Sequence, residues 1–208
     1  MKRFTFLCAA MLFAVVALAQ LSIWNGSSDI WTKGAGTKAS PYLIETAEQL
    51  AFISDMVNGG VTTYENTYFK LMTNIDLNNG VWVPIGNTKE TVFKGHLNGN
   101  NYSIYGTQAT LLGNIISSSI SHLNIEMQGL AKYAESSTIS YIYSNALFPT
   151  NQDNDCNIDR DFGCIVSECL NSDITFCIGK TNATGIWMNL FVGIVGKATN
   201  SNISNCRT

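Results

Sequence analysis

The densest group of metal-ligand residues in the chain is a short acidic segment near residue 157. Oxygen-bearing side chains stand at every second position, as Asp153, Asp155, Asn157, Asp159 and Asp161. Carboxylate and amide oxygens are the ligands that calcium prefers. Ile158 occupies the position of the invariant glycine in EF-hand loops, and Arg160 supplies a counter-charge. The segment therefore predicts either a weak calcium site or a solvated acidic loop.

The remaining acids and histidines do not form a catalytic set. Glycoside hydrolysis needs two carboxylates that flank one bond. The acids of the repeated blocks described below fall in different columns or different copies: Glu135, Glu168 and Asp173. Neither histidine has a second zinc ligand at close spacing. We interpret His96 as an exposed turn residue and His122 as a packing or bend residue, and we expect no catalytic residue and no organic cofactor.

In the repeated blocks described below, one column of outward-pointing residues could still serve a polysaccharide lyase. Such an enzyme needs a base near a carboxylate-binding cation. Lys197, Glu168 and Tyr133 share one column of the repeat with Asn114. The alternative interpretation is a solvated face of the protein. Of the two, we expect the solvated face.

A thirteen-residue block occurs four times, and this repeat predicts the architecture. The copies cover Leu111–Leu123, Leu130–Ile142, Ile165–Cys177 and Ile194–Cys206. Each copy has a serine, then one residue, then an isoleucine, and the isoleucines are Ile120, Ile139, Ile174 and Ile203. A fixed register of this kind is typical of a solenoid, in which one short unit stacks on the next. We expect parallel strands, an inward isoleucine ladder, and an adjacent Ser/Thr column that points outward.

Four cysteines fall in or beside these blocks, and Cys156 lies between two of them. Cys169 takes a column that holds small or apolar residues in the other copies. Cys177 and Cys206 share the last column, so stacked strands would place them about 4.8 Å apart. We expect buried thiols rather than a disulfide framework, with Cys156 as the most exposed thiol.

The chain before the repeats is predicted to form an entry segment, a helix and irregular first coils. Residues 20–67 form the entry segment and helical cap, and residues 68–208 form the coils. Thr46 and Gln49 fit a capping box at the start of a helix over 47–57, which would cover the open end of the stack. We expect short strands within 41–44, 68–71, 75–77, 81–86 and 93–104, with Gly or Asn at the bends between them. The chain stops shortly after the last block, so we also expect either a truncated protein or self-association through an uncapped C-terminal coil.

The first nineteen residues have the pattern of a cleavable signal peptide. Lys2 and Arg3 precede an apolar stretch, and a small-residue cleavage motif ends at Ala19. Its removal changes the formal net charge from −3 to −5. The apolar stretch is too short for a transmembrane helix, and we expect no membrane span after signal cleavage. Only 13% of the 208 residues are charged and no basic run is present, which argues against nucleic-acid binding.

Two groups of motifs resemble one known family. The first runs through Pro41-Tyr-Leu-Ile44, Tyr68-Phe-Lys-Leu71, Asn74-Ile-Asp-Leu77 and Trp82-Val-Pro-Ile-Gly86; the second pairs Gly193-Ile-Val-Gly196 with Ser201-Asn-Ile-Ser-Asn-Cys206. In this order they resemble the GLUG-motif proteins, which are secreted or surface proteins of Bacteroidales-type bacteria. Lys132 and Ser167 depart from that pattern, because each replaces the second glycine of the motif in a middle copy.

This resemblance implies an all-β fold, a right-handed parallel β-helix of the pectin-lyase-like shape, and an exported protein with an adhesion-like role. We therefore expect a secreted or cell-surface module without catalytic activity, whose partners are glycans or proteins of the cell surface. Two alternatives remain: a β-helix polysaccharide lyase or glycoside hydrolase, and a scaffold segment of a larger secreted protein such as a surface peptidase.

Overall fold

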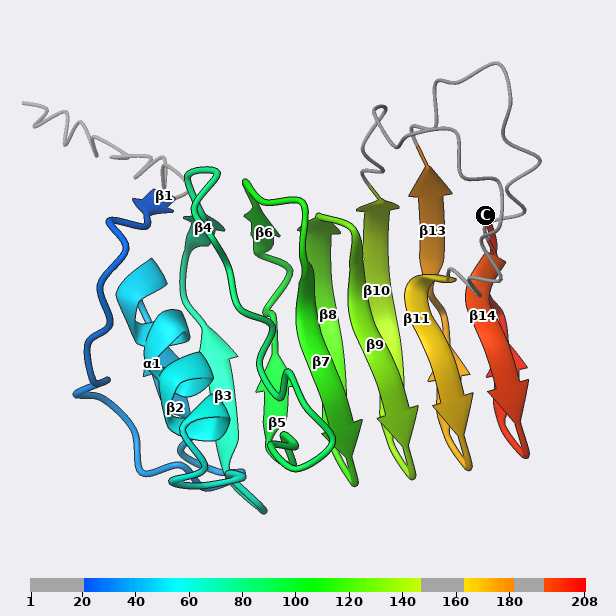
Figure 1. Cartoon of the computed structure of the whole chain (residues 1–208), viewed down its shortest axis with the longest axis horizontal. Coiled ribbons are helices and arrows are strands. Elements are labelled where there is room, and N and C mark those ends of the chain that lie inside the picture. Colours follow the sequence, from blue (N-terminus) through cyan, green and yellow to red (C-terminus); the bar gives the residue numbers. More distant parts are fainter. Residues whose placement is uncertain (1–20, 147–162, 182–192) are drawn as a thin grey trace, which may run out of the picture.

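The computed structural model describes residues 21–146, 163–181 and 193–208. Nearly all of the regular structure is β-strand, in two sheets whose paired strands run parallel (Figure 1). The signal-peptide residues 1–19 and the acidic segment 153–161 lie outside the described residues, so their predictions are not tested by the structure.

The larger sheet holds eleven strands, and its main path is β1-β4-β6-β8-β10-β12-β15. Strands β2, β3, β5 and β13 branch from that path. The bounds are β1 (Leu21–Ile23), β2 (Tyr42–Ile44), β3 (Tyr68–Leu71), β4 (Asn74–Asp76), β5 (His96–Asn98), β6 (Ser103–Tyr105), β8 (Ser119–Glu126), β10 (Thr138–Ala146), β12 (Asp173–Thr175), β13 (Ile178–Thr181) and β15 (Asn202–Ser204).

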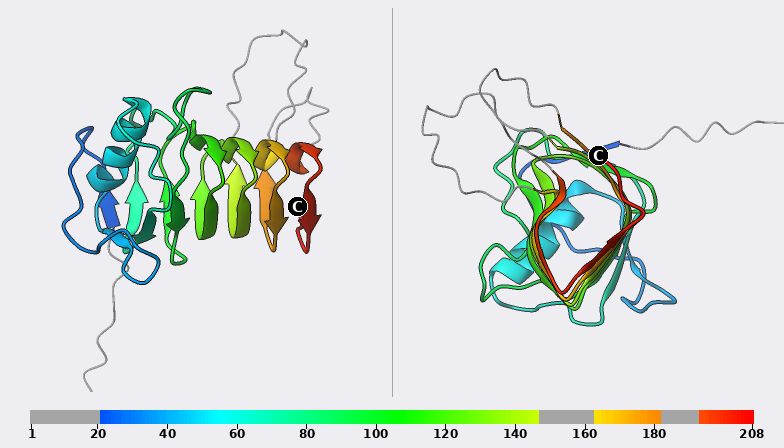
Figure 2. Two further views of the ribbon diagram at one scale, coloured as in Figure 1. Left: turned by 90° about the horizontal axis from the view of Figure 1, so that it is seen from below. Right: turned by 90° about the vertical axis from the view of Figure 1, so that its right-hand side faces the viewer.

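The smaller sheet has four strands in the order β14-β11-β9-β7. These strands are β7 (Thr110–Ile116), β9 (Gly129–Glu135), β11 (Gly163–Leu170) and β14 (Gly193–Thr199). Each repeated block thus supplies one strand to the smaller sheet and the next strand to the larger one. Viewed end-on, the two sheets diverge from a common corner and face each other across the interior (Figure 2).

The isoleucine column pairs in register, as the repeat predicts. Ile139 pairs with Ile120 on one side and with Ile174 on the other, and Ile174 pairs with Ile203. The first three are fully buried, whereas Ile203 is 41% exposed because β15 ends the sheet order. Full burial of such a side chain contributes roughly 1.5–3 kcal/mol. The next column, with Ser121, Ser140, Thr175 and Ser204, is only half-buried, as expected for an outward row.

The serine common to the four blocks forms a second ladder at the corner between the two sheets, and this ladder is buried at Ser118, Ser137 and Ser172. The Ser118 N–H donates to Ser137 Oγ at 3.2 Å, the Ser137 N–H to Ser172 Oγ at 3.2 Å, and the Ser172 N–H to Ser201 Oγ at 3.1 Å. Each of these three bonds satisfies a main-chain donor that the sharp turn leaves without a strand partner.

Helix α1 (Ala47–Asn58) lies beside β2 and β3 at the N-terminal end of the strand array (Figure 1). Thr46 caps it, because the Thr46 Oγ1 accepts a hydrogen bond from the Gln49 N–H at 3.3 Å. In a capping box, the Gln49 side chain would accept a hydrogen bond from the Thr46 N–H. Here it accepts from the Glu45 N–H instead. Leu50, Ile53 and Val57 face the core, as their spacing predicts.

One of the expected early strands, over 81–86, is wrong. Residues 81–86 are not a strand, and only Ile85 makes an isolated bridge, to Leu112. The indole of Trp82 turns inward and donates to the Leu111 carbonyl at 3.1 Å, and Gly86 has a φ of +78°, so the segment cannot stay extended. The segment 93–104 holds the short strands β5 and most of β6, and the bend between them has Asn100 and Asn101 at positive φ, as the sequence predicts.

Candidate functional site

A bend at the same position of three repeated blocks carries an unusual column of aromatic residues. His122, Tyr141 and Phe176 occupy equivalent positions, and all three have a φ between 53° and 56°. Bulky side chains are rare in this left-handed region, where asparagine and glycine are favoured. The bend confirms the interpretation of His122 as a bend residue.

The three rings stack directly on one another. The His122 and Tyr141 centroids are 4.8 Å apart with planes at 20°, and the Tyr141 and Phe176 centroids are 5.1 Å apart with planes at 3°. Tyr141 is 50% exposed and Phe176 is 48% exposed. Because each face of the Tyr141 ring lies against a neighbouring ring, the surface that it offers to solvent is the ring edge.

A hydroxyl row runs beside this aromatic column on the outer surface of the larger sheet. Ser121, Ser140, Thr175 and Ser204 each stand one position before the bend column. Successive parallel strands repeat about every 4.8 Å, so the hydroxyls recur at that interval. Together, the hydroxyl row and the aromatic column form a long surface with both hydrogen-bonding and apolar groups.

In the outward row that could serve a lyase, the charged side chains form an ion pair and the polar ones bond to groups outside the row. Asn114, Tyr133, Glu168 and Lys197 stand in register, as the sequence predicts. Lys197 Nζ lies 2.9 Å from Glu168 Oε1, and both side chains are about half exposed. The Tyr133 hydroxyl donates to Glu135 Oε2 at 3.0 Å. Burial, the hydrogen bond to Glu135 and the nearby Glu135 and Glu168 charges raise the pKa of Tyr133.

His96 is not the exposed turn residue that its neighbouring glycines predict. It lies in β5, half-buried, with its ring stacked on Tyr68 at 4.3 Å and its Nδ1 within 2.8 Å of the Ser119 hydroxyl. Burial and the charge of Lys38 lower its pKa, so the imidazole is neutral at pH 7. The sequence could not show this environment, because Tyr68 and Ser119 come from other strands.

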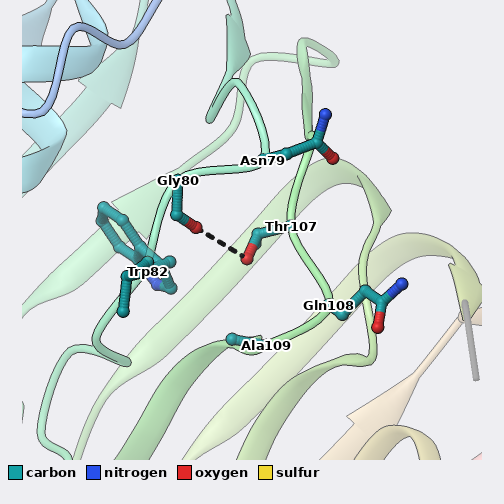
Figure 3. Close-up of a pocket in the computed structure, with 7 residues that line it drawn as sticks. Asn79, Gly80, Trp82, Thr107, Gln108 and Ala109 are labelled. Atoms are coloured by element: carbon teal, nitrogen blue, oxygen red, sulfur yellow. Dashed lines mark hydrogen bonds between the residues drawn. The ribbon is translucent and has the colours of Figure 1, made fainter. Parts of the chain in front are cut away.

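A pocket of about 450 Å³ opens between two loops of the early coils (Figure 3). Its lining residues are Asn79, Gly80, Val81, Trp82, Thr107, Gln108 and Ala109. The Thr107 hydroxyl donates to the Gly80 carbonyl at 3.4 Å and joins the two loops. The amides of Asn79 and Gln108 extend away from Trp82 (Figure 3). None of the seven lining side chains titrates near neutral pH, so this pocket offers hydrogen bonds but no acid or base.

The cysteines of the described residues behave largely as the sequence predicts. Cys169 and Cys177 are buried and free, and Cys206 is half-buried and free. The Cys177 N–H lies 3.4 Å from Cys206 Sγ, so the two residues are neighbours in adjacent strands. Cys156 lies outside the described residues. Within the described parts of the chain, no group of three or more His, Cys, Asp or Glu side chains could hold a metal ion.

Comparison with known proteins adds one partial match. No protein-family model matches the chain. No solved structure matches it either. A curated protein named "Putative Gly-rich membrane protein", from Evansella cellulosilytica, is 34% identical over 113 residues. The matched region covers 50% of this chain and 12% of that protein, so this chain spans a small part of its relative's length.

Proposed function

We propose that this chain is an exported, non-catalytic β-helix module that binds a glycan or a protein at the cell surface. The observation that carries the proposal is the long outer surface of the larger sheet, where a hydroxyl row and a stacked aromatic column repeat in register. Surfaces that combine apolar and hydrogen-bonding groups in this way are typical of recognition sites.

The architectural part of the proposal is a closed, right-handed parallel coil with α1 over its N-terminal end. Its support is the regular alternation between the two parallel sheets, together with a buried core that both sheets share. The resemblance to GLUG-motif proteins points to the same shape. A crystal structure would contradict this part if successive units did not wind in one sense around a single core.

The location at the cell surface is inferred from the signal-peptide pattern and from the relative's printed name. That name describes a membrane protein, and it applies to a chain of which the matched region is only 12%. Among the described residues, none of the helices combines the length and the apolar character needed to cross a bilayer. Fractionation of producing cells, with the chain followed by antibody, tests the location, and retention in the cytoplasm would contradict it.

The binding part of the proposal is tested directly with the purified chain. We expect it to bind at least one class among cell-surface glycans, extracellular matrix proteins and intact cells, measured on glycan and protein arrays and by cell adhesion. Absence of binding in all three assays would overturn the proposal. Cleavage of uronic-acid polysaccharides by the purified chain would also overturn it, in favour of a β-helix enzyme.

A further inference from the structure

The fourth block, residues 194–206, exposes an apolar side that the earlier blocks keep buried. Its strands β14 and β15 end their sheet orders, and β14 lies at the far end of the array from α1 (Figure 1). Ile203 is 41% exposed, whereas Ile174 in the same column of the third block is fully buried. Ala198 is likewise exposed, and its equivalent Cys169 is fully buried. We call this exposed side of residues 194–206 the terminal edge.

Three main-chain groups at the corner of each earlier block bind the block that follows. In the third block, the Asn171 N–H donates to the Thr199 carbonyl at 3.0 Å. The Ser172 N–H donates to Ser201 Oγ at 3.1 Å, and the Ser172 carbonyl accepts from the Asn202 N–H at 3.0 Å. The first and second blocks make the same three contacts with their successors. One arrangement of donors and acceptors thus recurs at three interfaces within the fold.

The fourth block presents the same groups at the terminal edge. They are the N–H of Asn200 and the N–H and carbonyl of Ser201, and none of them has a hydrogen-bond partner within the described residues. Asn202 and Ser204 bond back to the third block through their main chains. Alternate residues of a strand direct their N–H and carbonyl groups to opposite edges, so the main chain of Ile203 faces outward.

These groups define the chemistry of the segment that would fit the terminal edge. The Ser201 N–H requires a hydroxyl oxygen, which the next serine supplies in each earlier block. The Ile203 side chain requires an apolar neighbour, as Ile203 itself is for Ile174. An extended segment with the pattern Ser-x-Ile, where x is any residue, supplies both in one register. A slip of one residue would turn its isoleucine away from the core.

Two folded copies of this chain do not match at the terminal edge. Tail to tail, each copy would bring a Ser201 N–H donor, but both Ser201 hydroxyls already bond to Ser172 and Thr199. Head to tail, the column of Ile203 would meet β2, the first strand of that column. The free edge of β2 is occupied, because the Leu43 N–H donates to the Lys33 carbonyl at 3.0 Å. The directional corner therefore favours a segment that is not already part of a stack.

We propose that the terminal edge is the docking site for an extended segment of a partner protein that carries Ser-x-Ile and adds to both sheets as a further coil. Addition of a strand to an exposed sheet edge is an established mode of peptide recognition. Strand β15, with the sequence Asn-Ile-Ser, has no charge or proline to oppose such pairing. The inference goes beyond the proposed function, because the terminal edge is separate from the outer surface of the larger sheet.

The test titrates the full chain into a fluorescent peptide with the sequence of residues 130–142, followed by fluorescence polarisation. A control peptide with Ser137→Ile and Ile139→Ser keeps the composition but loses the Ser-x-Ile register. In the chain, Ile203→Pro removes an outward N–H, and Ile203→Lys places a charge in the apolar column. Val81→Lys is the control chain, because Val81 is 90% exposed on a loop of the early coils.

We expect the peptide to bind the parent chain and Val81→Lys equally, and to bind both Ile203 variants at least about tenfold more weakly. The control peptide should show a similar loss against the parent. Bound peptide should also slow deuterium exchange of the amides in residues 200–204. Circular dichroism should show that all four chains are folded, since Ile203 and Val81 are exposed.

Failure of the peptide to bind, equal affinity of the two peptides, or full affinity in both Ile203 variants would each overturn the inference. Association of the parent chain that protects residues 200–204 without peptide would also overturn it, because the occupant would then be a second copy. None of these outcomes bears on the proposed function, whose observation lies on the outer surface of the larger sheet.

Discussion

The buried hydroxyls of the serine ladder perform at each corner what a capping residue performs at a helix end. Ser137 and Ser172 each accept a main-chain N–H from the preceding block and donate to a carbonyl two residues earlier, as Ser137 Oγ does to Glu135 at 2.8 Å. Ser118 Oγ donates to the Phe93 carbonyl at 2.9 Å. Ser118, Ser137 and Ser172 are at most 3% exposed, so water cannot replace these bonds. A polar side chain is therefore required at this position of an otherwise apolar interior.

We expect Ser137→Ala to lower the free energy of unfolding by about 1–3 kcal/mol, because it leaves the buried Ser118 N–H without a partner. Urea unfolding followed by circular dichroism measures this change. Ser140→Ala is the matched control, since Ser140 lies three residues later on the outer surface, and its effect should stay within about 0.5 kcal/mol. Equal losses in the two variants would show that the hydroxyl ladder does not stabilise the corner.

The buried thiol of Cys177 should make the free energy of unfolding depend on pH in alkaline solution. Burial raises its pKa from 9.0 to about 12, and the side chain is fully inaccessible. Between pH 9 and 12 the unfolded chain loses this proton while the folded chain keeps it. The free energy of unfolding should therefore fall as pH rises through that window, by up to about 1.4 kcal/mol per pH unit, and be unaffected by this group below pH 9.

Urea unfolding at pH 8, 9 and 10 tests this expectation. Tyr64, whose pKa burial and Tyr42 raise to about 12, adds a slope of the same sign only above pH 10. In the comparison variant Cys177→Ala, the free energy of unfolding should fall less steeply between pH 9 and 10. A parent and a variant with the same slope in that interval would contradict the assignment to Cys177.

At the scale of elements, the parallel strand pairs and the inward ladder support each other. A shift of one residue in the register of β10 would turn its apolar side chains outward, so burial of Ile139 between Ile120 and Ile174 fixes the pairing. The same ladder continues toward the N-terminus, where Leu97 pairs with Ile120 and Phe69 with Leu97. One column thus links the irregular early coils to the regular later ones.

We expect Ile139→Ala to lower the free energy of unfolding by about 2–5 kcal/mol, because it leaves a cavity between two fully buried neighbours. Ile203→Ala makes the same chemical change in the same column. Ile203 is 41% exposed, so its loss should be smaller, about 1 kcal/mol or less. Denaturant unfolding measures the loss of unfolding free energy in each variant. Equal losses at Ile139 and Ile203 would show that burial within the ladder is not the source of the stability.

At the scale of the whole molecule, each strand is stabilised mainly by its two neighbours in the stack. A strand in such a sheet should open first where one of its two neighbours is missing. Strands β14 and β15 end their sheet orders, whereas β8 and β10 are paired on both sides. Main-chain amides of β8 and β10 should therefore exchange with deuterium more slowly than those of β15, as mass spectrometry of peptic peptides can measure. Uniform exchange rates along the stack would contradict this expectation.

Much of this architecture was predictable because a repeat places chemically equivalent residues in equivalent environments. The isoleucine register, the outward hydroxyl row and the helix after Thr46 follow from spacing alone. The strand limits around Trp82 and the burial of His96 did not, because they depend on contacts with Leu111 and Tyr68, which lie far away in the sequence. The aromatic column was visible as a column, but its left-handed backbone and its ring stacking needed coordinates.

The register between β10 and β12 has a practical consequence. Ile139 pairs with Ile174 across 35 residues of chain in the same way that Ile120 pairs with Ile139 across 19, so the spacing of the strands does not depend on how much sequence connects them. A change in the length of the connection between β10 and β11 should therefore leave the Ile120–Ile139 and Ile139–Ile174 pairs in register.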